Sequence, residues 1–335
     1  MIDTGMVIEW IIKSLVLILG LTGGFAYLTW LERRLLARFQ SRIGPNRAGP
    51  FGLGVPIADA VKAFLKEELI PHYADKVIFV LAPVITVVPA LTVLAVIPWG
   101  EPLQMFGRQV SLYISDVNVG IVYIMAITSI SVYGITLAGW SSNNKYALLG
   151  GLRATAQMIS YELALGLSMV GPALVAGSLS LVDIVHAQQN TLWYAILQPA
   201  AFILFFISST AEINRAPFDM PEAEQELTAG YHTEYSGMKF ALFFMAEYIK
   251  MIAVSVIGST LFLGGFDGPF VGQFPWLGPL YLIIKTVIWL MVLIWLRATW
   301  PRIRYDRLMS LGWKILFPFA LLNVMVTAFV VALVG

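Results

Sequence analysis

Apolar stretches long enough to cross a bilayer recur along the whole sequence, separated by segments that carry charges, proline or glycine. An α-helix needs about 20 mainly apolar residues to span the hydrocarbon core. The stretches lie near residues 8–31, 77–98, 117–140, 155–178, 191–212, 239–264, 276–297 and 312–334. The sequence has no internal repeat and no polar stretch long enough for a soluble domain. The pattern therefore predicts one domain over residues 1–335, an all-α, polytopic membrane bundle of eight transmembrane helices.

A shorter pattern follows the first apolar stretch. Residues 38–54 are rich in glycine and proline, which predicts irregular backbone. Over residues 56–69 apolar and charged residues recur with helical spacing, the apolar ones at Ile57, Val61, Phe64 and Leu65 and the charged ones at Asp59, Lys62 and Lys66. This segment is too short and too charged to cross a membrane, so it predicts an amphipathic helix. It would lie along the membrane interface or pack on a partner protein, and the two possibilities are compatible.

Basic residues are distributed unevenly between the connections. Seventeen lysines and arginines lie in or beside the first, third, fifth and seventh connections, whereas the even-numbered connections contain only Arg108. Positive residues are enriched in cytoplasmic loops. The connections 32–76, 141–154, 213–238 and 298–311 are therefore predicted to be cytoplasmic, with both chain termini outside the cytoplasm. The chain would be a multi-pass protein of the cell inner membrane or plasma membrane.

The composition of the chain excludes several kinds of partner and cofactor. Only 12% of the residues are charged, against about 25% in soluble domains. A net charge of +1 gives no basic field for nucleic acid, so no nucleic-acid partner is expected. The chain has no cysteine, which excludes thiolate-bound iron–sulfur clusters, and its three histidines lack the spacing of a metal site. We expect no metal and no directly bound cofactor, so any redox centres would lie in other subunits.

The ionisable residues inside or at the edge of the predicted spans include Glu162, Glu212, Glu247, Lys250 and Lys285. A charged group at the bilayer centre costs about 2.5 to 3.5 kcal/mol on insertion scales, so such groups are kept where they are paired or used. Glu247 and Lys250 are three residues apart and would share one helix face. They could form a neutralising ion pair or take part in proton transfer, since desolvation favours the protonated form of a carboxylate.

The fifth connection is the segment richest in carboxylates. Its acidic residues are Glu212, Asp219, Glu222, Glu224, Glu226 and Glu234. Asp219 and Glu222 have the spacing of a helix capping box. Capping does not explain the remaining acids, whose mutual repulsion is costly unless they share protons or meet cations. The arginines of the first and seventh connections could supply those cations, so we interpret the acidic group as functional.

Four motifs, in order along the chain, carry a resemblance to a known family. They are ERR at 32–34 with RIGPNRAGPFG at 42–52, GGLRATAQMISYE at 150–162, EINRAPFD at 212–219 with EYSG at 234–237, and RATWPRIRYD at 297–306. With these motifs the chain resembles the membrane-arm, quinone-site subunit of respiratory complex I, the proton-pumping NADH:quinone oxidoreductase, which is known as its H subunit. The likeness covers nearly the whole chain.

The resemblance implies a subunit, without a redox centre of its own, at the joint between the membrane arm and the hydrophilic redox arm. It would help to form the tunnel for the substrate quinone and would couple quinone reduction to proton translocation. Partners would be membrane lipid and the other complex I subunits, among which are those that hold the flavin and iron–sulfur clusters.

The family's functional residues map onto this sequence by motif. Its acidic proton relay maps onto Asp59, Glu162, Glu212, Glu222, Glu224 and Glu247, with Glu226 in the same stretch. Its residues near the quinone tunnel or its entrance map onto Arg33, Arg42, Arg215, Phe218, Arg297 and the loop 44–52. The third predicted span, residues 117–140, has no carboxylate, so any acidic position that relatives use there is absent.

Two alternatives stay open. The membrane subunit of an energy-converting hydrogenase would be a redox partner without a quinone tunnel, and the complete loop 42–52 and fifth connection argue against it. A stand-alone cation or proton antiporter would also keep buried charges. Its large cytoplasmic loops would have nothing to bind, and the inverted repeats seen in many transporters are not visible.

Overall fold

The computed structural model describes residues 4–105, 108–219 and 229–334. Its α-helices are α1 (Thr4–Phe39), α2 (Val55–Leu65), α3 (Lys76–Thr92), α4 (Gly120–Ser141), α5 (Lys145–Ala176), α6 (Leu181–Gln189), α7 (Tyr194–Leu197), α8 (Pro199–Glu212), α10 (Gly237–Phe262), α11 (Leu277–Thr299), α12 (Tyr305–Leu311) and α13 (Phe317–Val334). Short 3-10 turns lie at Pro50–Gly52, Val93–Val96 and Gly230–His232, and a π-helical turn at Gly312–Leu316 joins α12 to α13. The helical bundle predicted from the sequence is confirmed.

Among the described residues, seven helices are long and apolar enough to cross a membrane. The predicted fifth span, residues 191–212, is the exception, because its apolar helix α8 has only 14 residues. The break lies at Gln198, whose backbone is not helical and which precedes Pro199. A residue before proline is driven out of the helical conformation by the proline ring. The prediction of eight long spans is therefore corrected to seven long helices and one short one.

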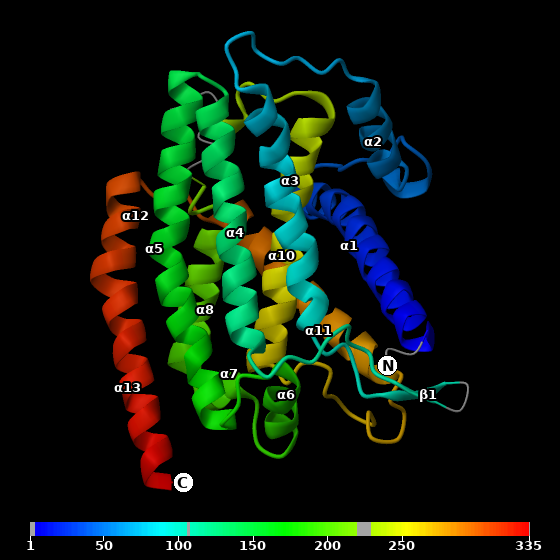
Figure 1. Cartoon of the computed structure of the whole chain (residues 1–335), viewed down its shortest axis with the longest axis vertical. Helices are drawn as coiled ribbons and strands as arrows, with labels where there is room; N and C mark the ends of the chain where they lie inside the picture. Colours follow the sequence, from blue (N-terminus) through cyan, green and yellow to red (C-terminus); the bar gives the residue numbers. More distant parts are fainter. Residues whose placement is uncertain (1–3, 106–107, 220–228, 335) are drawn as a thin grey trace.

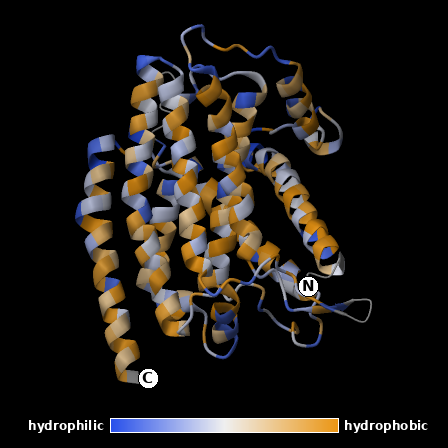
Figure 2. Cartoon of the chain, in the orientation of Figure 1, coloured by the Kyte–Doolittle hydropathy of each residue, from blue (hydrophilic) through white to orange (hydrophobic). Residues whose placement is uncertain are grey.

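Helix α10 lies near the centre of the bundle and packs against α1, α3 and α11, while α5 packs against α4, α8 and α13 (Figure 1). Helix α1 is inclined to the other long helices, and both termini lie toward the same end of the bundle. Hydrophobic residues cover most of the length of the helices, and hydrophilic residues gather at their ends (Figure 2). The main apolar core lies where α3, α4, α5, α8, α10 and α11 meet.

The amphipathic helix predicted after the glycine- and proline-rich loop is α2, which ends at Leu65, four residues earlier than predicted. It lies beside one end of the bundle (Figure 1). Its apolar residues Ile57, Val61 and Phe64 are exposed, the last at 71%. Two ion pairs attach this region to the bundle. Asp59 pairs with Arg33 of α1 at 2.9 Å, and Glu68, beyond the helix, pairs with Lys239 of α10 at 2.5 Å.

Several predicted connections contain helix. Helix α1 continues to Phe39, α5 already begins at Lys145, and α12 occupies the second half of 298–311. The prediction followed apolar length alone, whereas Lys, Arg, Leu and Ala extend a helix well once it leaves the apolar layer. The all-α prediction also missed an antiparallel pair of three-residue strands, β1 (Leu103–Met105) and β2 (Arg108–Val110), which pairs Leu103 with Val110.

Candidate functional site

Three consecutive residues near the end of α1 point in three directions, because successive residues of an α-helix are about 100° apart. Glu32 points into the bundle and is only 2% exposed. Arg33 points to α2, where it pairs with Asp59. Arg34 donates to the backbone oxygen of Phe51 at 2.9 Å, and its guanidinium lies over the Phe51 ring. The ERR motif thereby attaches an irregular loop and an amphipathic helix to one end of α1, while its acidic member enters the core.

The segment after α8 turns Arg215 toward Glu32. Asn214 adopts a left-handed conformation with φ of 57°, which asparagine tolerates better than most residues. The fully buried Gln157 of α5 then holds both ends of the turn. Its side-chain nitrogen donates to the backbone oxygens of Ala211 at 2.8 Å and Phe218 at 2.7 Å. The motif at 150–162, which contains Gln157, therefore positions the motif at 212–219.

These segments build a buried ionic cluster from four parts of the chain, which we call the arginine cluster: Glu32, Arg215, Glu247, Tyr248 and Arg297. Arg215 donates to Glu32 at 3.1 Å and lies 2.7 Å from Glu247. Arg297 of α11 also pairs with Glu32. The Arg215 guanidinium lies over the Tyr248 ring, 4.4 Å from its centroid, and the Tyr248 hydroxyl bonds to Glu32 and Arg215. Two arginines and two carboxylates thus compensate one another.

Electrostatics favours the charged form of Arg215. Burial on its own would lower the pKa of this guanidinium, but the carboxylates of Glu247 and Glu32 outweigh it and raise the pKa above its ordinary value. Arg215 is only 6% exposed, so its charge depends on these partners. Removing one partner of a buried ion pair typically costs about 3 to 5 kcal/mol, because the remaining charge is left uncompensated.

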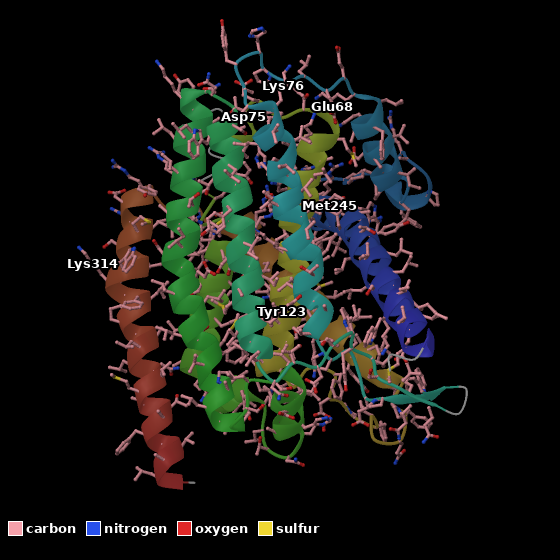
Figure 3. The ribbon with its side chains drawn as sticks, in the orientation of Figure 1. Glu68, Asp75, Lys76, Tyr123, Met245 and Lys314 are labelled. Carbon is pink, nitrogen blue, oxygen red and sulfur yellow. The ribbon has the colours of Figure 1, made fainter. Side chains whose placement is uncertain are left out.

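A second group, which we call the carboxylate group, adjoins the arginine cluster through α10. It comprises Glu212 at the end of α8, Lys250 on α10 and Glu162 on α5. Lys250 interacts electrostatically with Glu212, Glu247 and Glu162. Glu162 accepts a hydrogen bond from the hydroxyl of Ser129 on α4. Met245, two residues before Glu247 on α10, lies between the end of the bundle marked by Glu68, Asp75 and Lys76 and the level of Tyr123 (Figure 3).

Two small cavities meet at the carboxylate group, and Glu212, Ile213 and Lys250 line both of them. Each holds about 20 Å³ of space for water, and a cavity needs about 10 to 15 Å³ of such space for one molecule. The first cavity extends to Glu247 and Asn214, and the second to Thr128 and Ser131 of α4. Polar side chains and room for single water molecules therefore continue from α10 to α4.

The structure brings together only part of the residues predicted from the sequence. Glu162, Glu212, Glu247, Arg215 and Arg297 converge in the two groups described above. Asp59 and Arg33 form their own pair beside α2, and Arg42 is exposed and donates to Gln40. Phe218 is buried against Tyr161, with 5.7 Å between the ring centroids. Glu222, Glu224 and Glu226 lie outside the described residues.

Sequence reasoning did not select Glu32, Gln157, Tyr248 or Ser129 as site residues. Glu32 could have been found, since it is a carboxylate at the end of an apolar span followed by two arginines. The other three are uncharged residues within helices, so only the fold reveals them. The predicted pairing of Glu247 with Lys250 was incomplete, because Glu247 also meets Arg215 from a distant segment.

The arrangement places side chains that can bind and release protons close to one another inside the bundle. Within the ranges 4–105, 108–219 and 229–334, no three His, Cys, Asp or Glu side chains come together as a metal site. The chemistry available to the described side chains is that of carboxylates, an ammonium group, guanidinium groups and hydroxyls in a medium of low polarity, where each charge acts strongly on its neighbours.

Comparison with known proteins gives consistent matches over nearly the whole chain. The family model described as NADH dehydrogenase matches residues 12–328. The chain is 53% identical to the H subunit of NADH-quinone oxidoreductase from Thermomicrobium roseum over 324 residues, which cover 94% of each chain. It is 52% identical to an H subunit of the same enzyme from Geobacter metallireducens, over 92% of each chain. Identity to subunit 8 from Thermus thermophilus is 51%, over 96% of this chain and 87% of that one.

Proposed function

Because the chain belongs to the family of the H subunit of NADH-quinone oxidoreductase, complex I, we propose that it forms part of the quinone tunnel of that enzyme and couples quinone reduction to proton translocation. The names of its relatives describe a subunit of a larger oxidoreductase, so its partners are other subunits of complex I. The flavin and iron–sulfur clusters that reduce quinone would be held by those subunits. Quinone is the proposed substrate and membrane lipid the proposed surroundings.

One observation carries this proposal, namely that the arginine cluster and the carboxylate group are continuous. Glu247 belongs to the first through Arg215 and reaches the second through Lys250, which is three residues further along α10. Buried charges of both signs thus extend from the end of α1 to Glu162 of α5, which contacts Ser129 of α4. A charge that changes at one end alters the protonation equilibria of its neighbours in turn.

Quinone reduction is a suitable source of such a charge, since each two-electron reduction requires two protons. We propose that Arg33, Arg42, Arg215, Phe218, Arg297 and the loop 44–52 lie along the tunnel or near its entrance. Two features support this. The exposed apolar face of α2 is suited to an isoprenoid substrate or lipid, and the nearby arginines would stabilise developing negative charge.

The proposed proton relay consists of Asp59, Glu162, Glu212, Glu222, Glu224, Glu226 and Glu247. Of these, Glu162, Glu212 and Glu247 have the strongest support, because each interacts with Lys250. The remaining four are proposed by motif alone. Asp59 would act at the α2 end, where it meets Arg33.

We propose further that the protein lies in the cell inner membrane, with the four basic connections in the cytoplasm and both termini outside it. The bias of basic residues and the position of both termini toward one end of the bundle support this orientation. The basic connections would then face the redox arm.

Conservative substitutions test the relay. Glu212→Gln and Glu247→Gln keep side-chain shape and remove the ability to carry a charge, so both should lower NADH-driven quinone reduction and proton pumping of the purified complex in liposomes. General acid and base groups typically contribute factors of about 10² to 10⁴. We expect at least about a tenfold loss, with normal amounts of assembled complex. Glu9→Gln is the matched control, since Glu9 lies on α1 and pairs with Lys13 away from both groups.

Two results would decide the matter. A selective loss in E212Q and E247Q, with E9Q unaffected, would support the relay. Full pumping in both variants would mean that these carboxylates only neutralise neighbouring cations, and the proposed coupling role of the chain would be wrong.

A further inference from the structure

Helix α4 has no carboxylate, yet its Ser129 contacts Glu162 of α5. Its central part instead carries a series of hydroxyl residues: Thr128, Ser129, Ser131 and Thr136. Ser129 donates to Glu162 of α5, and Thr128 and Ser131 line the second cavity together with Glu212 and Lys250. The hydroxyls of Thr128, Ser129 and Ser131 therefore lie between Glu212 and Glu162.

Because of helical geometry, two neighbouring residues of α4 can face the second cavity and Glu162, respectively. Thr128 and Ser129 are consecutive, so their side chains diverge by about 100°. Thr128 faces the cavity beside Lys250, while Ser129 faces Glu162. The route from the cavity to this carboxylate therefore crosses two adjacent residues of α4.

The Ser129 hydroxyl has two acceptors. It lies 2.9 Å from the backbone oxygen of Met125 and also contacts a carboxylate oxygen of Glu162. A serine hydroxyl has one hydrogen to donate and can accept as well. When Glu162 is charged, Ser129 donates to it. When Glu162 is protonated, its O–H can donate to Ser129, whose own hydrogen turns to Met125. The pair is satisfied in both protonation states.

From these contacts we propose that Ser129 is a positioning residue for proton transfer at Glu162, and that the hydroxyls of Thr128, Ser129 and Ser131 connect Glu212 with Glu162. This proposal deepens the proton relay proposed above and rests on it. A proton leaving the Glu212 side is passed by a water molecule in the second cavity to these hydroxyls and on to Glu162, each group accepting one proton and releasing another. No hydroxyl becomes charged, so α4 carries no buried charge of its own.

Ser129→Ala tests this directly in the assembled complex. It should lower NADH-driven quinone reduction and proton pumping by about tenfold, the size expected for a lost hydrogen bond to a charged group. Ser129→Thr keeps the hydroxyl and should retain most of the activity. Thr136→Val is the matched control, because it removes a hydroxyl of the same helix that bonds to Thr155 of α5 at 2.6 Å, away from both cavities.

An infrared measurement distinguishes a positioning role of Ser129 at Glu162 from a general disturbance of the structure by the substitution. The carboxyl band of Glu162 is identified as the signal lost in Glu162→Gln when quinone is reduced. In S129A this band should shift, because the carboxyl group loses a hydrogen-bond partner, whereas in T136V it should stay in place. An unshifted band with unchanged turnover in S129A would overturn the role of Ser129.

The experiments distinguish a failure of the proposal for Ser129 from a failure of the proton relay. If E212Q and E247Q lose pumping and S129A does not, the relay stands and the proposal for Ser129 is wrong. If all three keep full pumping, the relay and the proposal both fall. Equal losses in S129A, S129T and T136V would show that α4 packing alone was disturbed, which would also contradict the proposal.

Discussion

Glu32 shows how much one side chain can connect. It accepts from Arg215, 183 residues away in sequence, and from Arg297, 265 residues away. Its carboxylate therefore joins α1, the segment after α8 and α11 at one point. With only 2% of its surface exposed, little water is available to replace either arginine's partner if the carboxylate is removed.

We predict that Glu32→Ala lowers the free energy of unfolding by about 3 to 5 kcal/mol, because it leaves Arg215 and Arg297 without a common partner. The measurement is the thermal unfolding of the detergent-solubilised complex, followed with the amount of chain retained in membranes. Arg304→Ala is the control. It breaks an ion pair with Asp306 whose side chains are largely exposed, and such pairs contribute at most about 1 kcal/mol. Equal stability of the two variants would contradict the compensating role of Glu32.

At the residue scale, sequence reasoning found which charges are buried better than it found their partners. It selected Glu162, Glu212 and Glu247 because a charge within an apolar span is conspicuous. It could relate Glu247 only to Lys250, since that spacing is local. The contact of Glu247 with Arg215 depends on how α8 meets α10, which no local pattern specifies.

At the scale of elements, close backbone packing positions the segment that leads into α10. Gly150 of α5 lies against the turn Gly230–His232, where a Cβ atom would come within 2.5 Å of the Cα of Gly230 and 3.0 Å of the backbone nitrogen of Tyr231. Tyr231 lines the first cavity beside Glu212. The motif at 150–162 thus positions the second half of the fifth connection by steric contact, in addition to the hydrogen bonds of Gln157 to its first half.

We predict that Gly150→Ala costs about 1 to 3 kcal/mol, the usual range for overpacking, and makes the 229–236 segment more sensitive to protease. The displaced Tyr231 should also lower quinone reduction. Gly23→Ala is the matched control, because this glycine is also helical and its Cβ would meet nothing within 4 Å in the chain. That change should be neutral or stabilise the helix by up to about 1 kcal/mol. The prediction fails if both variants behave alike under limited proteolysis.

The helices could be predicted from the sequence where the thickness of the bilayer determines their apolar length. Apolar length located seven long helices, and helical spacing located α2. The break at Gln198 and Pro199, the helical start at Lys145 and the strand pair after α3 were missed, because they depend on backbone restrictions and packing outside the apolar layer.

For the whole molecule, the arrangement gives two chemically different ends. The arginine motif, α2 and the basic connections lie toward one end, and both termini toward the other (Figure 1). An opposite orientation in the membrane would place the basic end outside, where it could not meet the redox arm that we propose lies in the cytoplasm. Orientation therefore decides whether the proposed function is possible.

Single cysteines can report this orientation, since the natural chain contains none. We predict that Asn190→Cys, in the connection after α6, reacts with a membrane-impermeant maleimide in right-side-out vesicles, while Lys145→Cys, at the start of α5, reacts only in inverted vesicles. Both sites are exposed in the chain. Labelling in denaturing detergent controls for sites covered by partner subunits. The reverse pattern would refute the proposed orientation.

The unequal lengths of α1 and α8 also determine how the protein meets a bilayer of given thickness. At 1.5 Å per residue, the 36 residues of α1 extend about 54 Å and the 14 of α8 about 21 Å, against a hydrocarbon core of about 30 Å. The surplus of α1, a mostly uncovered helix, can be accommodated by tilt. The deficit of α8 is completed by the one-turn helix α7 before it and by the mostly buried segment 213–218 after it. A difference between helix length and bilayer thickness is thus accommodated by tilting of α1, which lies at the outside of the bundle. The position of Glu212, at the end of the short helix α8, therefore depends little on lipid thickness.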